Sequence, residues 1–126
     1  MRAVDTNVLV RLIARDDAKQ VAAADAFVEM GAWVSVLALV EATWVISAVY
    51  GRSARDIGNA VEMLLSHRSL TLQDQDVVAT ALQNFRKRPG LGFSDCMLLE
   101  LARKAGHLPL GTFDRALGKL DGALAV

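Results

Sequence analysis

The sequence predicts an α/β protein in which a parallel sheet is covered on both faces by helices. Short apolar segments alternate along the chain with longer segments of helical periodicity, and acidic residues follow several of the short segments. Parallel strands need right-handed crossover connections, and helices in these connections cover the sheet. The length of 126 residues suits a single domain, residues 1–126, with one core and no linker.

Five short segments have the composition of strands. The first is expected to be buried and to stop at Asp5, and the second is aromatic and β-branched. In the third, apolar and polar residues alternate with a period of two. The fourth contains a proline, which makes it a weaker candidate for a strand. They are residues 3–5, 32–36, 69–72, 108–114 and 123–126.

The segments between these strands carry apolar residues at helical spacing. Thr6 and Ser94 are candidate caps for two of the helices, and Ser53 with Asp56 has the pattern of a capping box. One helix, over residues 37–50, is apolar on nearly every face, so we expect it to be buried on most sides. The helical patterns cover residues 6–15, 21–28, 37–50, 53–65, 77–88, 94–106 and 115–119.

Composition limits the classes of function. Fourteen basic and fourteen acidic residues give no net charge, so a site for a polyanion must be local. The single cysteine excludes an intrachain disulfide, the chain opens without the pattern of a signal peptide, and no apolar stretch has membrane-spanning length. We therefore expect a cytoplasmic protein without membrane contact. Hydrophobic residues make up 53% of the chain, more than a small core needs, which suggests a partner surface.

Asp5 and Asp114 lie at the ends of predicted strands, and Asp95 is expected at the same edge because it lies at the start of a predicted helix. The carboxyl ends of parallel strands share one edge of the sheet, and ligands bind at that edge in open α/β folds. Each residue also has a structural alternative, because a carboxylate stabilises the first turn of a helix as a cap or through the helix dipole.

Glu41 lies within an apolar row of the predicted helix over residues 37–50. An ionised carboxylate is costly in such a row unless a partner compensates its charge. The alternative to a functional role is a buried ion pair with an arginine such as Arg11.

Four carboxylates at one edge would repel each other, and a divalent cation removes this conflict. Oxygen ligands without histidine or cysteine select Mg²⁺ or Mn²⁺ over Zn²⁺. A metal held by few carboxylates keeps positions open for water and phosphate, as metal-assisted phosphodiester hydrolysis requires.

Four segments resemble, in order and spacing, the acidic motifs of PIN-domain ribonucleases, and in particular those of the VapC toxins of type II toxin–antitoxin systems. They are residues 5–9 (DTNVL), 39–45 (LVEATWV), 93–98 (FSDCML) and 111–115 (GTFDR). The resemblance implies a three-layer α/β/α sandwich, a homodimer, RNA cleavage with Mg²⁺ or Mn²⁺, and neutralisation by a cognate antitoxin. It also implies that Asp5, Glu41, Asp95 and Asp114 are catalytic and bind metal, with Asn7 and Thr112 as supporting polar residues.

RNA requires positive charge near the acidic residues. The local candidates are Arg86, Lys87 and Arg88 ahead of the loop to Asp95, and Arg115 beside Asp114. For the basic run, the alternative is a solvated helix end, where the dipole favours cations.

Four aromatic and cysteine side chains are expected to have structural roles. Trp33, Trp44 and Tyr50 are interpreted as core or interface residues and not as base-stacking platforms. Cys96 has apolar helical neighbours and is interpreted as a small core residue.

The sequence leaves three alternative functions open. The chain could be a PIN nuclease that is not a toxin, or a PIN-fold binding module without catalysis. A phosphatase of the haloacid-dehalogenase type is weaker, because Asn7 stands where that pattern has a second aspartate.

Overall fold

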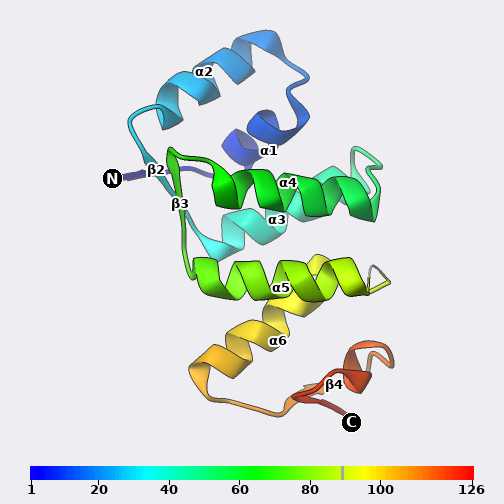
Figure 1. The fold of residues 1–126 in the computed structure, drawn as a ribbon. Coiled ribbons are helices and arrows are strands. Elements are labelled where there is room, and N and C mark those ends of the chain that lie inside the picture. The colour runs from blue at the N-terminus through cyan, green and yellow to red at the C-terminus, as the bar shows by residue number, and fades with distance from the viewer. Residues whose placement is uncertain (89) are drawn as a thin grey trace. The chain divides into compact units, whose positions relative to one another are not determined.

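The structure, a computed structural model, describes residues 1–88 and 90–126 (Figure 1). The fold is α/β, with parallel strands flanked by helices, and is consistent with the predicted three-layer α/β/α architecture. The chain divides into two compact units, residues 1–75 and 76–126. In the described part of the chain, no helix is both long enough and apolar enough to cross a membrane.

The first unit contains a three-stranded parallel sheet in the order β1-β2-β3. Helices fill both crossovers, as the alternating pattern predicted. Its elements are β1 (Arg2–Ala3), α1 (Thr6–Ala14), α2 (Ala18–Val28), β2 (Ala32–Val34), α3 (Val36–Ala48), α4 (Ala54–Ser66) and β3 (Leu70–Leu72).

The second unit contains two helices and a two-stranded parallel sheet. The predicted last helix is a single 3₁₀ turn, and the predicted helix end before Pro89 can be described only to Arg88, since Pro89 lies outside the described residues. Its elements are α5 (Gln75–Lys87), α6 (Phe93–Ala105), β4 (Leu110–Thr112), η1 (Leu117–Lys119) and β5 (Ala123–Ala125).

Each unit has apolar contacts that hold its helices. In the first unit α1 packs against both α2 and α3, and it buries Leu9, Val10 and Leu12. In the second unit the rings of Phe85 on α5 and Phe93 on α6 meet edge to face, with centroids 5.9 Å apart. Such aromatic pairs add about 0.5–1.5 kcal/mol to the effect of burial. Helix α6 is therefore fixed close to its first residue.

Two of the three predicted helix starts are wrong in detail. Asp5, and not Thr6, caps α1, because its Oδ1 accepts the amide hydrogen of Val8 at 3.3 Å. Helix α6 begins earlier than predicted, after Gly92, and Ser94 lies inside its first turn without capping it. The early start places Phe93 in the core. The capping box of Ser53 and Asp56 on α4 is confirmed, with bonds of 3.2 and 3.4 Å.

The burial of two elements also differs from the prediction. Strand β1 is exposed at both residues because it lies at an edge of the three-stranded sheet, and there the Arg2 guanidinium stacks over the Phe27 ring at 3.9 Å. Helix α3 is open on one face, where Leu37 is 69% and Trp44 65% exposed. Trp44 is therefore not a core residue of the chain.

Candidate active site

The first unit holds Asp5 and Glu41. Thr6, the residue after Asp5, forms a hydrogen bond with Glu41. Asp5 follows β1 and is exposed, with one carboxylate oxygen held by the Val8 amide. Glu41 lies on α3, which packs against α1. The Thr6 hydroxyl donates to Oε2 of Glu41 at 2.8 Å. The residue next to Asp5 thus orients the Glu41 side chain.

The expected burial of Glu41 is wrong. Glu41 shares the open face of α3 with Leu37 and Trp44, at helical spacing, and its side chain is exposed. Because Glu41 is exposed, its charge needs no compensating cation. The reason to expect a bound metal ion must therefore come from the other acidic residues.

Arg11, the predicted alternative partner of Glu41, binds elsewhere. It donates to Asp16 at 3.0 Å and to the Tyr50 hydroxyl at 2.8 Å, and it also contacts Gln20. The Tyr50 hydroxyl donates to the other oxygen of Asp16 at 2.8 Å. This hydrogen bond, together with the Arg11 charge, lowers the pKa of Asp16. Tyr50 thus has a structural role between α3 and the end of α1.

The second unit holds Asp95 and Asp114. Asp95 lies half-buried in the first turn of α6, where the helix dipole favours a negative charge. Asp114 is exposed after β4, and its Oδ1 accepts the amide hydrogen of Leu117 at 2.8 Å. The Thr112 hydroxyl accepts the amide hydrogen of Asp114 at 3.0 Å. Thr112 therefore supports the turn that carries Asp114.

Asn7 is the second predicted supporting residue. It is exposed and lines a shallow groove of about 330 Å³ between α1 and α2, together with Val8 and Phe27. Among the described residues, no hydrogen bond joins Asn7 to Asp5 or Glu41, so its supporting role stays a prediction.

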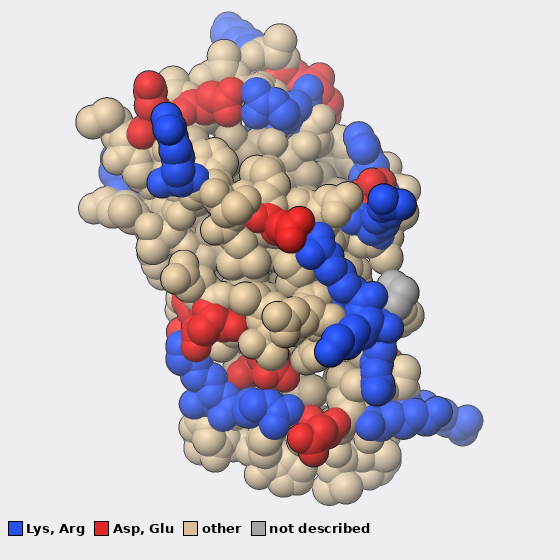
Figure 2. All heavy atoms as spheres, in the orientation of Figure 1, with Lys and Arg blue, Asp and Glu red and all other residues tan. Residues whose placement is uncertain are grey.

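The predicted RNA contacts lie at two places in the second unit. Arg86, Lys87 and Arg88 are exposed at the C-terminal end of α5, and basic side chains gather there in Figure 2. Arg115 is exposed beside Asp114. Elsewhere on the visible face basic and acidic side chains alternate, as the zero net charge predicts.

Two further side chains of α6, those of Cys96 and Glu100, are buried. Cys96 is fully buried, as predicted, and burial is the main reason that its pKa is raised to about 11. Glu100 was missed by the sequence analysis although its side chain is only 8% exposed. Its place four residues after Cys96, on the buried side of an amphipathic helix, was the signal that could have identified it.

The donor chemistry of the four predicted ligands fits a hard cation. They offer carboxylate oxygens only, which Mg²⁺ and Mn²⁺ prefer. Each unit supplies two of them, and within the part of the chain that the structure describes no group of three or more His, Cys, Asp or Glu side chains could hold a metal ion. Metal binding by these four residues therefore stays a prediction.

The fold and the acidic residues after β1 and β4 define an α/β protein of the nuclease type. A family model for the PIN domain matches residues 2–123, and the chain belongs to the PIN-domain family. PIN domains are generally metal-dependent nucleases, so the chain is a hydrolase at this level of description, and the dehalogenase-like alternative is excluded. Neither a curated protein nor a solved structure matches the chain.

Proposed function

We propose that the chain is an endoribonuclease that uses Mg²⁺ or Mn²⁺ to hydrolyse RNA phosphodiester bonds, with both units forming one PIN domain. The observation that supports this proposal is that a PIN-family chain retains all four acidic residues, two in each unit, and that all four reach the surface. They are Asp5, Glu41, Asp95 and Asp114.

Three of these carboxylates share a geometry that suits ligands. Asp5, Glu41 and Asp114 each have one oxygen fixed by a hydrogen bond, and among the described residues the other oxygen has no such partner. One oxygen thus orients the group while the other is open to a ligand, as supported metal sites require. Fixed carboxylates lose less conformational freedom when they bind.

The chemistry divides between the cation and the protein. A bound divalent ion would lower the pKa of water and neutralise charge that develops on the phosphate. The carboxylates would hold the ion, and one of them would accept the proton of the attacking water. Lys87, Arg88 and Arg115 bind the RNA phosphates beside the scissile bond.

The proposed role is that of a VapC-type toxin in the cytoplasm, which acts as a homodimer and is neutralised by a cognate antitoxin. The resemblance of the four acidic segments supports this role. The exposed apolar side chains of Leu37 and Trp44 on α3 offer a surface for a protein partner. A short reading frame directly upstream that encodes a DNA-binding protein would distinguish a toxin from another PIN nuclease.

The cleavage proposal is tested with purified protein and labelled single-stranded and structured RNA. We expect cleavage with Mg²⁺ or Mn²⁺, none with excess EDTA, and a rate at least about 100-fold lower in Asp95→Asn, which is the scale of losing a general base. Glu29→Gln, an exposed acid-to-amide change on the first unit, is the matched control and should cleave normally. Cleavage that persists in EDTA, or in Asp95→Asn, contradicts the proposal.

A further inference from the structure

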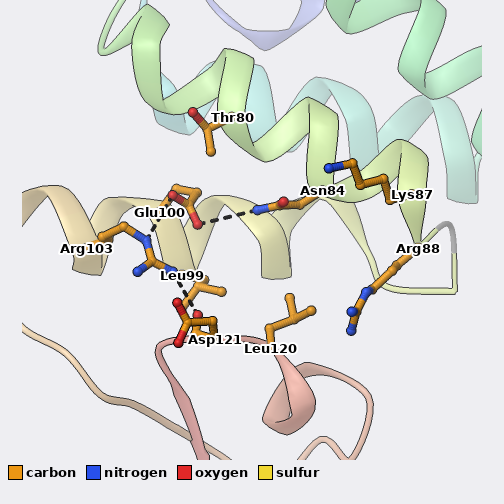
Figure 3. A pocket seen from close by; sticks show the side chains of 9 residues that line it. All are labelled: Thr80, Asn84, Lys87, Arg88, Leu99, Glu100, Arg103, Leu120 and Asp121. Atoms are coloured by element: carbon orange, nitrogen blue, oxygen red, sulfur yellow. Dashed lines mark hydrogen bonds and ion pairs between the residues drawn. The ribbon is translucent and has the colours of Figure 1, made fainter.

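A pocket of about 480 Å³ lies entirely within the second unit, between α5, α6 and the segment that leads to β5 (Figure 3). Its volume falls in the range of about 300–1,000 Å³ that is typical of small-molecule sites. The lining residues are Thr80, Asn84, Lys87, Arg88, Leu99, Glu100, Arg103, Leu120 and Asp121.

Glu100 forms the polar centre of this pocket. Its buried carboxylate accepts hydrogen bonds from Arg103 Nε at 3.2 Å and Asn84 Nδ2 at 3.4 Å, one on each oxygen (Figure 3). Arg103 is itself fixed, because it also donates to the Asp121 carbonyl at 2.7 Å. A carboxylate accepts about four hydrogen bonds in total, so Glu100 retains capacity for N–H donors of a ligand.

Lys87 and Arg88 provide positive charge at one side of the same pocket. Both are exposed, and neither forms an ion pair with another described residue. In Figure 3, Arg88 extends toward Leu120, whereas Lys87 lies beside Asn84. Two adjacent cations of this kind match the charge of a phosphate group.

The pocket is distinct from the proposed metal ligand on the same helix. Asp95 and Glu100 are five residues apart on α6, which separates them by about 140° around the helix axis. The mechanism proposed above uses Asp95 and gives Glu100 no role. Glu100 with its fixed partners therefore has no place in the proposed cleavage, whereas Lys87 and Arg88, which line the same pocket, are among the proposed phosphate contacts.

We propose that this pocket binds a guanine nucleotide. The edge of guanine presents two adjacent N–H donors, from N1 and the 2-amino group, which match the two oxygens of Glu100. Leu120 offers an apolar contact for the base, and Lys87 with Arg88 binds the phosphate. Adenine presents one amino group at the corresponding edge and is expected to bind more weakly.

The proposal is tested by isothermal titration calorimetry with GMP, AMP and inorganic phosphate, in the absence of divalent cations. We expect GMP to bind at least about 10-fold more tightly than AMP, which corresponds to about 1.4 kcal/mol. Lys87→Ala and Arg88→Ala should each weaken GMP binding several-fold. Arg55→Ala, which removes an exposed cation from the first unit, is the matched control and should bind GMP as the wild type does.

Glu100→Gln tests the base contact, because it should remove the preference for GMP over AMP while phosphate binds as before. Its circular dichroism spectrum shows whether this variant folds. If it does not fold, Lys87→Ala and Arg88→Ala, the two cation variants, still test the proposal. No GMP binding at millimolar concentration, equal affinity for AMP, or GMP affinity unchanged in both cation variants overturns the proposal.

The source of the nucleotide is identified with a short guanine-containing RNA, added to Asp95→Asn protein so that it is not consumed. Displacement of GMP by this RNA shows that the pocket takes a guanine within a strand. A pocket that binds GMP but not the RNA takes the free nucleotide. GMP binding requires no cleavage, so failure of this proposal leaves the proposed nuclease function unaffected.

Discussion

At the scale of single residues, the sequence identified the acidic side chains as candidate metal ligands. It did not predict the hydrogen bonds that orient these side chains. Asp5, Glu41 and Asp114 each follow from a motif, whereas the hydrogen bond from Thr6 to Glu41 joins residues 35 positions apart. Local spacing carries no information on such a contact, because packing of α1 against α3 creates it. The prediction that Thr6 caps α1 was thus wrong. Thr6 instead orients the side chain of Glu41 through its hydroxyl group.

Thr6→Val tests this role. The change removes the hydroxyl at similar volume, so Glu41 loses its orienting bond, a loss of about 1 kcal/mol or roughly five-fold in Mn²⁺ affinity. Isothermal titration calorimetry gives the affinity, and thermal unfolding should change little because both side chains lie at the surface. Thr6→Ser is the control and should restore affinity. Equal losses in both variants would show that the hydroxyl is not responsible.

Cys96 provides a second prediction at this scale. Because burial raises the pKa of its thiol to about 11, the reactive thiolate is scarce at pH 8. We expect slow reaction with a disulfide reagent in the folded protein and fast, stoichiometric reaction in denaturant. The absorbance of the released thiolate measures both reactions. Rapid reaction of the folded protein would contradict the buried position of Cys96.

At the scale of elements, the periodicity of apolar residues predicted the bounds of the helices well. It predicted poorly which faces of the elements are buried. Helices α1, α3 and α4 begin and end within a few residues of the predicted bounds, because apolar spacing and turn residues are local signals. The open face of α3 and the exposed edge strand β1 depend on which neighbours each element has. An apolar helix predicts burial, but it also occurs where a partner protein covers the exposed face.

The helix caps give a matched stability test. Ser53→Ala removes a confirmed cap of α4 and should lower the free energy of unfolding by about 1 kcal/mol. Ser94→Ala removes a serine that the sequence suggested as a cap but that caps nothing, and it should change the free energy by less than about 0.5 kcal/mol. Urea denaturation measures both values. Similar losses in the two variants would contradict the observed start of α6.

At the scale of the whole molecule, charge and family membership constrain the function. The zero net charge leaves RNA binding to local groups such as the basic end of α5. Family membership was predictable because four separate motifs carry it over nearly the whole chain. The nucleotide pocket was not predictable, since it depends on contacts such as the one between Asn84 and Glu100, which only packing brings together.

The proposed nuclease function depends on Asp5, Glu41, Asp95 and Asp114 as ligands of a divalent cation. Mn²⁺ titration of the wild type, Glu41→Gln from the first unit and Asp114→Asn from the second tests it most directly, with Glu29→Gln as the control. We predict that the wild type and the control bind Mn²⁺ with the same affinity, and that each ligand variant weakens this binding at least about 10-fold, a loss of 1.4 kcal/mol or more. Undiminished Mn²⁺ affinity in either ligand variant would contradict the proposal that the substituted residue binds the cation.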